Sequence, residues 1–149
     1  MHMMKIRTLL IMAFLHFIAM YFLMYAMVDR AGYVYLNLNN LYMASLMTSP
    51  MLIIEIILMG SMYKEKKIVQ FLLAVSIVLF AVSFIFIRQQ TAIGNKEFIR
   101  SMIPHHSGAI LMCREADIKD RELQQLCTSI IKSQQSEIDQ MEEILGRLD

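Results

Sequence analysis

Three long apolar runs constrain the fold of this chain more than any other feature. They cover residues 8–28, 41–62 and 68–87, and each is close to the roughly 20 residues that a helix needs to cross a bilayer. A signal peptide is the competing interpretation of the first run, but its apolar part is only about 7–15 residues long. The first run also ends in the large residues Tyr21, Phe22 and Tyr25 rather than in a small-residue cleavage site. The sequence therefore predicts an all-α protein with three transmembrane helices.

Charged residues divide the chain into two regions. Before residue 88 they are rare, whereas from there onward Lys, Arg, Asp and Glu are dense. We therefore expect a three-helix transmembrane domain over residues 1–88 and a polar domain over residues 89–149. A hydrophobic content of 57% over 149 residues excludes an ordinary soluble domain. A net charge of +1 with no basic stripe excludes nucleic acid as an expected partner.

The positive charges beside the apolar runs predict an orientation. Lys5 and Arg7 precede the first run, and three lysines lie at positions 64–67, between the second and third runs. The loop over residues 29–40 has only one Asp and one Arg. Because positive flanks stay in the cytoplasm, we expect a cytoplasmic N-terminus in a bacterial inner membrane. The polar domain is then periplasmic or extracellular.

Methionines form a stripe along each of the first two runs, and each stripe has one ionisable residue near its middle. The first stripe consists of Met12, His16, Met20, Met24 and Met27. The second consists of Met43, Met47, Met51, Glu55, Met59 and Met62. An ionisable side chain inside a membrane needs a partner, so we expect the stripes to pack together with His16 near Glu55. Methionine is also a common packing residue, so a packing role and a metal-related role both stay open.

The polar domain has the pattern of two helices. Asn95 is a plausible N-cap for a helix that ends near residue 116, and Asp120 caps a second helix that ends near residue 148. Pro104 cannot donate a backbone hydrogen bond to the Arg100 carbonyl, so a kink or a restart is expected there. Since the connecting turn is short, the two helices should form an exposed antiparallel hairpin.

The position of the turn predicts which residues face one another. Facing residue numbers should sum to about 240, which places Cys113 opposite Cys127 and His106 opposite Gln134. For the two cysteines, a disulfide, a paired thiolate site and packed thiols all stay open. A lone hairpin leaves an apolar face uncovered. It should pair with a second copy, dock on the membrane domain or bind another subunit, and we expect the second copy first.

Soft metal donors gather early in the polar domain. Met102, His105 and Met112 share one helical face with Ala109, and His106 lies on the adjoining face with Cys113. Imidazole, thioether and thiolate suit Cu(I) or zinc and are poor ligands for magnesium or calcium. A helix core that happens to contain two histidines is the alternative interpretation.

Two segments resemble the domain-of-unknown-function family 305. They are FIRSMIPHHSGAILM at residues 98–112 and IKSQQSEIDQM at residues 131–141. The three preceding apolar runs look like a membrane-bound branch of that family. The resemblance implies a ferritin-like helical fold, with this hairpin as half of a four-helix bundle, and copper binding through Met and His, as in some periplasmic members. By position, the implied ligand candidates are Met102, His105, His106, Met112, Gln134, Glu137 and Met141. Cys113 stands where the family pattern requires no cysteine.

The motifs argue against an enzyme. No Glu-x-x-His pair of a di-iron site is present, and no nucleophile motif or phosphate-binding glycine loop occurs. We therefore expect a membrane-anchored protein that binds copper, as Cu(I) rather than Cu(II), for copper tolerance, storage or delivery. His16 and Glu55 would be a further metal-related pair within the membrane. The alternative is an accessory or assembly subunit of a larger membrane complex without catalysis of its own.

Overall fold

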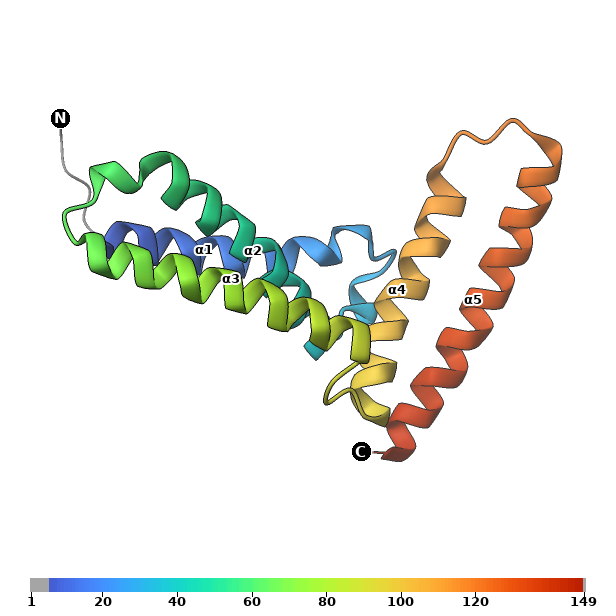
Figure 1. The fold of residues 1–149 in the computed structure, drawn as a ribbon. Helices are drawn as coiled ribbons and strands as arrows, with labels where there is room; N and C mark the ends of the chain where they lie inside the picture. The colour runs from blue at the N-terminus through green and yellow to red at the C-terminus, as the bar shows by residue number, and fades with distance from the viewer. Residues whose placement is uncertain (1–5, 149) are drawn as a thin grey trace. The chain divides into compact units, whose positions relative to one another are not determined.

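The computed structural model describes residues 6–148, and within this range the chain forms helices and no strand. The predicted all-α class is confirmed. Five α-helices follow one another along the chain (Figure 1). They are α1 (Ile6–Leu23), α2 (Leu38–Met59), α3 (Lys66–Gln89), α4 (Asn95–Glu115) and α5 (Arg121–Leu148). Three 3-10 helices lie between them, namely η1 (Met24–Met27), η2 (Ala31–Tyr33) and η3 (Gly60–Met62).

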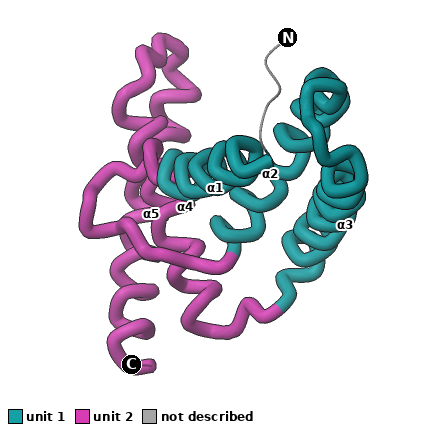
Figure 2. The backbone as a smooth tube through the Cα atoms, turned by 90° about the vertical axis from the view of Figure 1, so that its left-hand side faces the viewer, with its two compact units in different colours: residues 1–23, 39–91 teal, residues 24–38, 92–149 magenta. Residues whose placement is uncertain are grey.

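The described chain forms two compact units (Figure 2). Unit 1 contains the residues up to Leu23 together with Asn39–Thr91, and unit 2 contains Met24–Leu38 together with the residues from Ala92 onward. The predicted boundary at residue 88 lies close to the observed one after Thr91. The segment over residues 24–38 differs from the expectation, because it groups with the polar helices rather than with the apolar ones.

Unit 1 holds the apolar helices. Three stretches are long and apolar enough to cross a membrane, namely Ile6–Met27, Leu38–Met62 and Lys66–Gln89. Leu9, Ile56, Tyr63 and Val69 form the buried core between them. Large apolar side chains elsewhere on these helices are exposed. Arg7 is described at the start of α1, whereas Lys5 lies outside the described residues.

In unit 2, α4 and α5 pack against each other. Ile103, Ile110 and Ile138 are fully buried in their shared core. A disulfide joins Cys113 and Cys127 near the connecting turn, with 5.2 Å between the two Cα atoms. Of the three alternatives for these cysteines, a disulfide, a paired thiolate site and packed thiols, the structure shows the disulfide.

The two predicted helix caps had different outcomes. Asp120 caps α5, since its Oδ1 accepts a hydrogen bond of 2.8 Å from the Leu123 amide. Asn95 is instead the first residue of α4, and the cap position belongs to Gly94. Gly94 has no side chain to accept a bond from the first turn, but its carbonyl accepts the Phe98 amide at 2.9 Å.

The segment over residues 24–38 is bound along α4. The Asp29 amide donates a 2.8 Å hydrogen bond to Ser107 Oγ, and the Asp29 carboxylate forms an ion pair with Arg114. A methyl group added at Gly108 would lie 3.5 Å from the Met27 carbonyl oxygen, so η1 runs close against α4 at this glycine. Ser107 and Gly108, which follow the histidine pair, therefore hold this segment in place.

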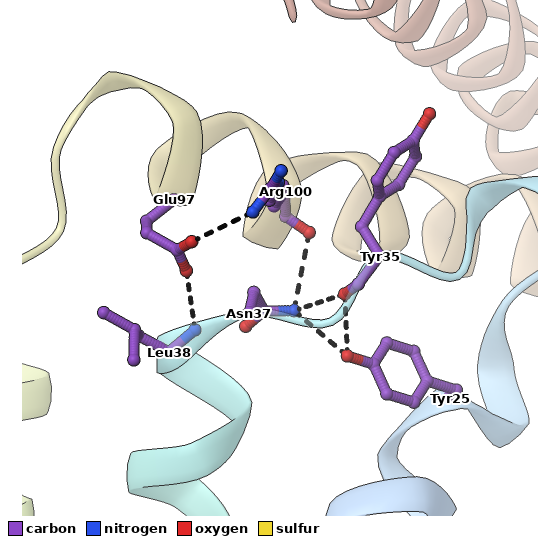
Figure 3. A network of polar contacts seen from close by, with 6 residues as sticks. All are labelled: Tyr25, Tyr35, Asn37, Leu38, Glu97 and Arg100. Atoms are coloured by element: carbon purple, nitrogen blue, oxygen red, sulfur yellow. Dashed lines mark hydrogen bonds and ion pairs between the residues drawn. The ribbon is translucent and has the colours of Figure 1, made fainter. Parts of the chain in front are cut away.

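Asn37 compensates for the proline inside α4. The helix continues through Pro104, so the predicted restart is wrong. The Asn37 amide nitrogen lies 3.4 Å from the Arg100 carbonyl, the acceptor that Pro104 cannot satisfy (Figure 3). This nitrogen shares its two hydrogens among three acceptors, since the Tyr35 carbonyl lies at 2.9 Å and the Tyr25 hydroxyl at 3.3 Å. Glu97 completes the network by accepting the Leu38 amide at 2.9 Å.

Replacing Asn37 with alanine should destabilise unit 2. Asn37 is only 5% exposed, and without it the Arg100 carbonyl loses its side-chain donor. A buried polar group left without a partner costs about 1–3 kcal/mol. Urea denaturation should show this loss in the free energy of unfolding, whereas Asn95→Ala, at an exposed position on α4, should change little. Equal stability of the two variants would contradict this role of Asn37.

Candidate metal site

His106 is the central residue of the candidate site. Its side chain is 8% exposed, and both ring nitrogens have partners. Nδ1 lies 3.0 Å from the Met102 carbonyl oxygen, and Nε2 lies 2.7 Å from Glu137 Oε2. Because a carbonyl only accepts hydrogen bonds, Nδ1 carries a proton. Nε2 is therefore the nitrogen that can offer a lone pair to a metal ion, in the orientation that histidine ligands commonly have.

Glu137 supplies a carboxylate on the neighbouring helix. Its Oε1 accepts a 2.8 Å hydrogen bond from Ser133, one turn earlier on α5. The bond from Ser133, followed by that from His106, holds the pKa of Glu137 below its usual range. The side chain is about half exposed. At neutral pH the site therefore contains an ionised carboxylate that is hydrogen-bonded to Ser133 and His106 and that ions in solution can reach.

The contact between His106 and Glu137 sets the register of two methionines. Met102 lies one turn before His106 on α4, and Met141 lies one turn after Glu137 on α5. In an antiparallel pair of helices, residues whose numbers have the same sum face one another. Met102 and Met141 have the same sum as His106 and Glu137, so the two methionines face one another. Met102 is partly buried, and Met141 packs against the core of unit 2. Two thioethers thus lie one turn from the imidazole–carboxylate pair, at the same level.

The other predicted ligands on unit 2 are placed differently. His105 is exposed, with its ring centroid 6.1 Å from that of His106. Met112 is 53% exposed and follows His106 by six residues, which is about 9 Å along the helix. Cys113 is oxidised in the disulfide, so it offers no thiolate. The register places Gln134 opposite Ala109 rather than opposite His106. The structure therefore brings His106 and Glu137 together, with Met102 and Met141 one turn away by register.

The donor set indicates which metal fits. Among residues 6–148, no group of three or more His, Cys, Asp and Glu side chains is placed to hold a metal ion. The further donors nearest to His106 and Glu137 by register are the thioethers of Met102 and Met141, which are soft ligands. Cu(I) accepts such ligands readily, whereas magnesium and calcium do not. The residues present fit Cu(I).

A second cluster of soft donors lies in unit 1. A groove of about 620 Å³ is lined by Met12, His16 and Met20 from α1 and by Met47, Met51, Ile54, Glu55 and Leu58 from α2. The two stripes thus meet, with His16 and Glu55 in the same groove. Met24 and Met27 do not line it, because the chain winds into η1 there and joins unit 2. Met59 packs in the core of unit 1 instead.

Two hydroxyl groups beside the candidate ligands were not predicted from the sequence. Ser133 binds Glu137, and the Tyr63 hydroxyl donates a 3.1 Å hydrogen bond to Glu55 Oε1. The four-residue spacing of Ser133 and Glu137 is a signal that sequence reasoning can use. Tyr63 follows the end of α2 and η3, so its contact depends on how the chain folds back at this point.

The lowered pKa of Glu137 predicts how the stability of unit 2 depends on pH. The ionised carboxylate stabilises the folded state above the unfolded value of 4.5, and this contribution is lost as the pH falls through the lower folded value. Glu137→Gln should therefore flatten the acid side of a plot of melting temperature against pH. Glu143→Gln, at an exposed position on the same helix, should leave it unchanged. Identical profiles for all three proteins would contradict the assignment.

Comparison with known proteins identifies the family. Residues 87–145 match the family described as "Domain of unknown function (DUF305)". The chain is 39% identical over 119 residues to "Uncharacterized protein L153" of Acanthamoeba polyphaga mimivirus, covering 78% of this chain and 76% of the relative. No solved structure matches. The chain belongs to the DUF305 family.

Proposed function

We propose that this protein is a membrane-anchored copper-binding protein that holds Cu(I) on the periplasmic or extracellular side, for copper tolerance, storage or delivery. One observation carries the proposal. His106 is oriented by the Met102 carbonyl, faces Glu137 at 2.7 Å, and has a methionine one turn away on each helix. The set combines an imidazole, a carboxylate and two thioethers on two helices that a disulfide also holds together.

The pair can exchange a proton for a metal ion. Two lone pairs would repel at 2.7 Å, so Nε2 of His106 and Oε2 of Glu137 share a proton when no metal is bound. Binding of Cu(I) at Nε2 displaces that proton, and the carboxylate then balances the charge of the ion. Met102 and Met141 need no deprotonation. Acid should therefore weaken the contribution of His106 while the thioether contribution persists.

The proposed location rests on charge and redox chemistry. A disulfide such as Cys113–Cys127 persists in an oxidising compartment. Arg7 lies at the start of α1, and the lysines at positions 64–67 lie just before and at the start of α3. Positive charges beside membrane helices favour the cytoplasmic side, so these helix ends should be cytoplasmic. Met112, Leu123 and Leu126 are between 44% and 54% exposed on α4 and α5. Such a surface supports pairing with a second copy, as half of a four-helix bundle, or contact with a partner membrane subunit.

The test is a Cu(I) titration of the whole protein, purified in detergent, against a competing chelator. We expect the unmodified protein to bind copper and Met102→Ala/His106→Ala to bind less per chain. Thr128→Ala, at an exposed position on α5 toward the turn, serves as a control that should bind normally. A protein that binds no copper but purifies from native membranes with a stoichiometric partner would support the accessory-subunit alternative instead.

A further inference from the structure

The groove between α1 and α2 has a composition that packing does not require. Two short rows of side chains line it, Met12, His16 and Met20 on one helix and Met47, Met51 and Glu55 on the other. Each row repeats every four residues, so the members of a row share one helical face. Four of these six side chains are thioethers. Leucine would fill the same space between apolar helices equally well, whereas a thioether adds a soft lone pair.

The two ionisable residues need compensation in an apolar setting. α1 and α2 are long and apolar enough to cross a membrane, and an ionised side chain at such depth is costly unless its charge is balanced. Glu55 is the acidic side chain in the lining of the groove, so one positive charge bound beside its carboxylate would balance it. A monovalent cation in the groove would make the whole site neutral. A divalent cation would leave a net positive charge.

From these two arguments we propose that the groove binds a soft monovalent metal ion of the Cu(I) or Ag(I) class. The thioethers of Met12, Met20, Met47 and Met51, with His16, are the candidate donors. Glu55 supplies the balancing charge. This site is separate from the one at His106, because its lining residues all belong to unit 1.

Tyr63 orients the carboxylate of the groove. Its hydroxyl donates to Glu55 Oε1 at 3.1 Å, and the tyrosine side chain is fully buried in the core of unit 1. Partners of this kind fix the direction of a ligand at metal sites. The groove, at about 620 Å³, is much larger than a metal ion. Methionine has three rotatable side-chain bonds, so the thioethers can turn toward an ion and close around it.

Ag(I), which does not change oxidation state, is a suitable probe. The whole protein carrying His106→Ala, purified in detergent, removes the central residue of the site in unit 2. In this background Met47→Leu/Met51→Leu removes two thioethers from the groove with little change in volume. Met43→Leu/Met59→Leu is the matched control, because both residues lie on α2 and neither lines the groove.

We expect the His106→Ala protein to bind one Ag(I) per chain and the control to do the same. The groove variant should bind at least about 10-fold more weakly, and Glu55→Gln should also weaken binding because the balancing charge is lost. Equal affinities in the groove variant and its control would overturn the proposal, as would a His106→Ala protein that binds no Ag(I). A groove variant that keeps its Ag(I) but changes its oligomeric state would also overturn it and would assign the groove to a second copy of the chain. None of these results depends on whether unit 2 binds copper.

Discussion

Replacing His106 with alanine should lower the affinity for Cu(I) by about 100-fold or more, beyond the 10–100-fold that loss of an outer partner typically causes. The imidazole is held on both sides, by the Met102 carbonyl and by Glu137. Its removal takes away the oriented nitrogen donor. A competition titration of the detergent-purified protein measures the change.

Glutamate variants on α5 provide the matched comparison for this prediction. Glu137→Gln keeps the shape of the side chain but removes the charge facing His106, so a loss of about 10–100-fold is expected. Glu143→Gln, also exposed on α5, should bind like the unmodified protein. If His106→Ala retains its helix content and binds Cu(I) normally, the site in unit 2 is not the copper site.

Removing the disulfide should produce the largest loss of stability. Cys113 and Cys127 are 14 residues apart, and closing a loop of about 15 residues restricts the unfolded chain by an amount worth about 3 kcal/mol. The variant Cys113→Ser/Cys127→Ser should therefore unfold at a lower urea concentration. Hydrogen exchange of the α4 and α5 amides measures the same loss locally.

Reduction of the unmodified protein is the natural control. A thiol reductant should lower its stability to that of the double serine variant and should leave the variant itself unchanged. An unmodified protein whose α4 and α5 amides exchange equally slowly with and without reductant would contradict the prediction.

The helices of this chain could be predicted well because their signals are local. Apolar runs of about 20 residues marked α1 to α3, and the Asp120 cap marked the start of α5. Cys113 and Cys127 lie close to the turn, so few residues separate them from the point at which the register was counted. These features depend on residues that are close together in the sequence, so local patterns are enough to predict them.

The partner of His106 was predicted three residues too early. Simple counting from the turn placed Gln134 opposite it, whereas the structure places Glu137 there. Helical side chains lean toward the N-terminus of their own helix. On α4 this direction leads away from the turn, and on α5 it leads back toward the turn. His106 therefore meets a residue on α5 that starts farther from the turn than counting alone suggests.

Contacts between the segment over residues 24–38 and α4 could not be predicted. The bond from Asp29 to Ser107 joins residues 78 positions apart, and the bond from Asn37 to Arg100 joins residues 63 apart. Such pairs depend on the path that a loop takes along a helix, and the periodicity of apolar residues in the sequence does not predict that path. The same contacts explain why Met24 and Met27 leave the predicted stripe.

Unit 2 is built from two separate stretches of the chain, and only one of them overlaps the family match. The family match begins at residue 87, yet the core of unit 2 also includes Tyr33, which is 8% exposed. A fragment restricted to the matched residues would lack this ring, the Asn37 amide and the partner of Arg114. The compact unit is therefore larger than the family match. The other stretch, residues 24–38, lies between the apolar helices α1 and α2, so the packing of unit 2 requires both parts of the chain.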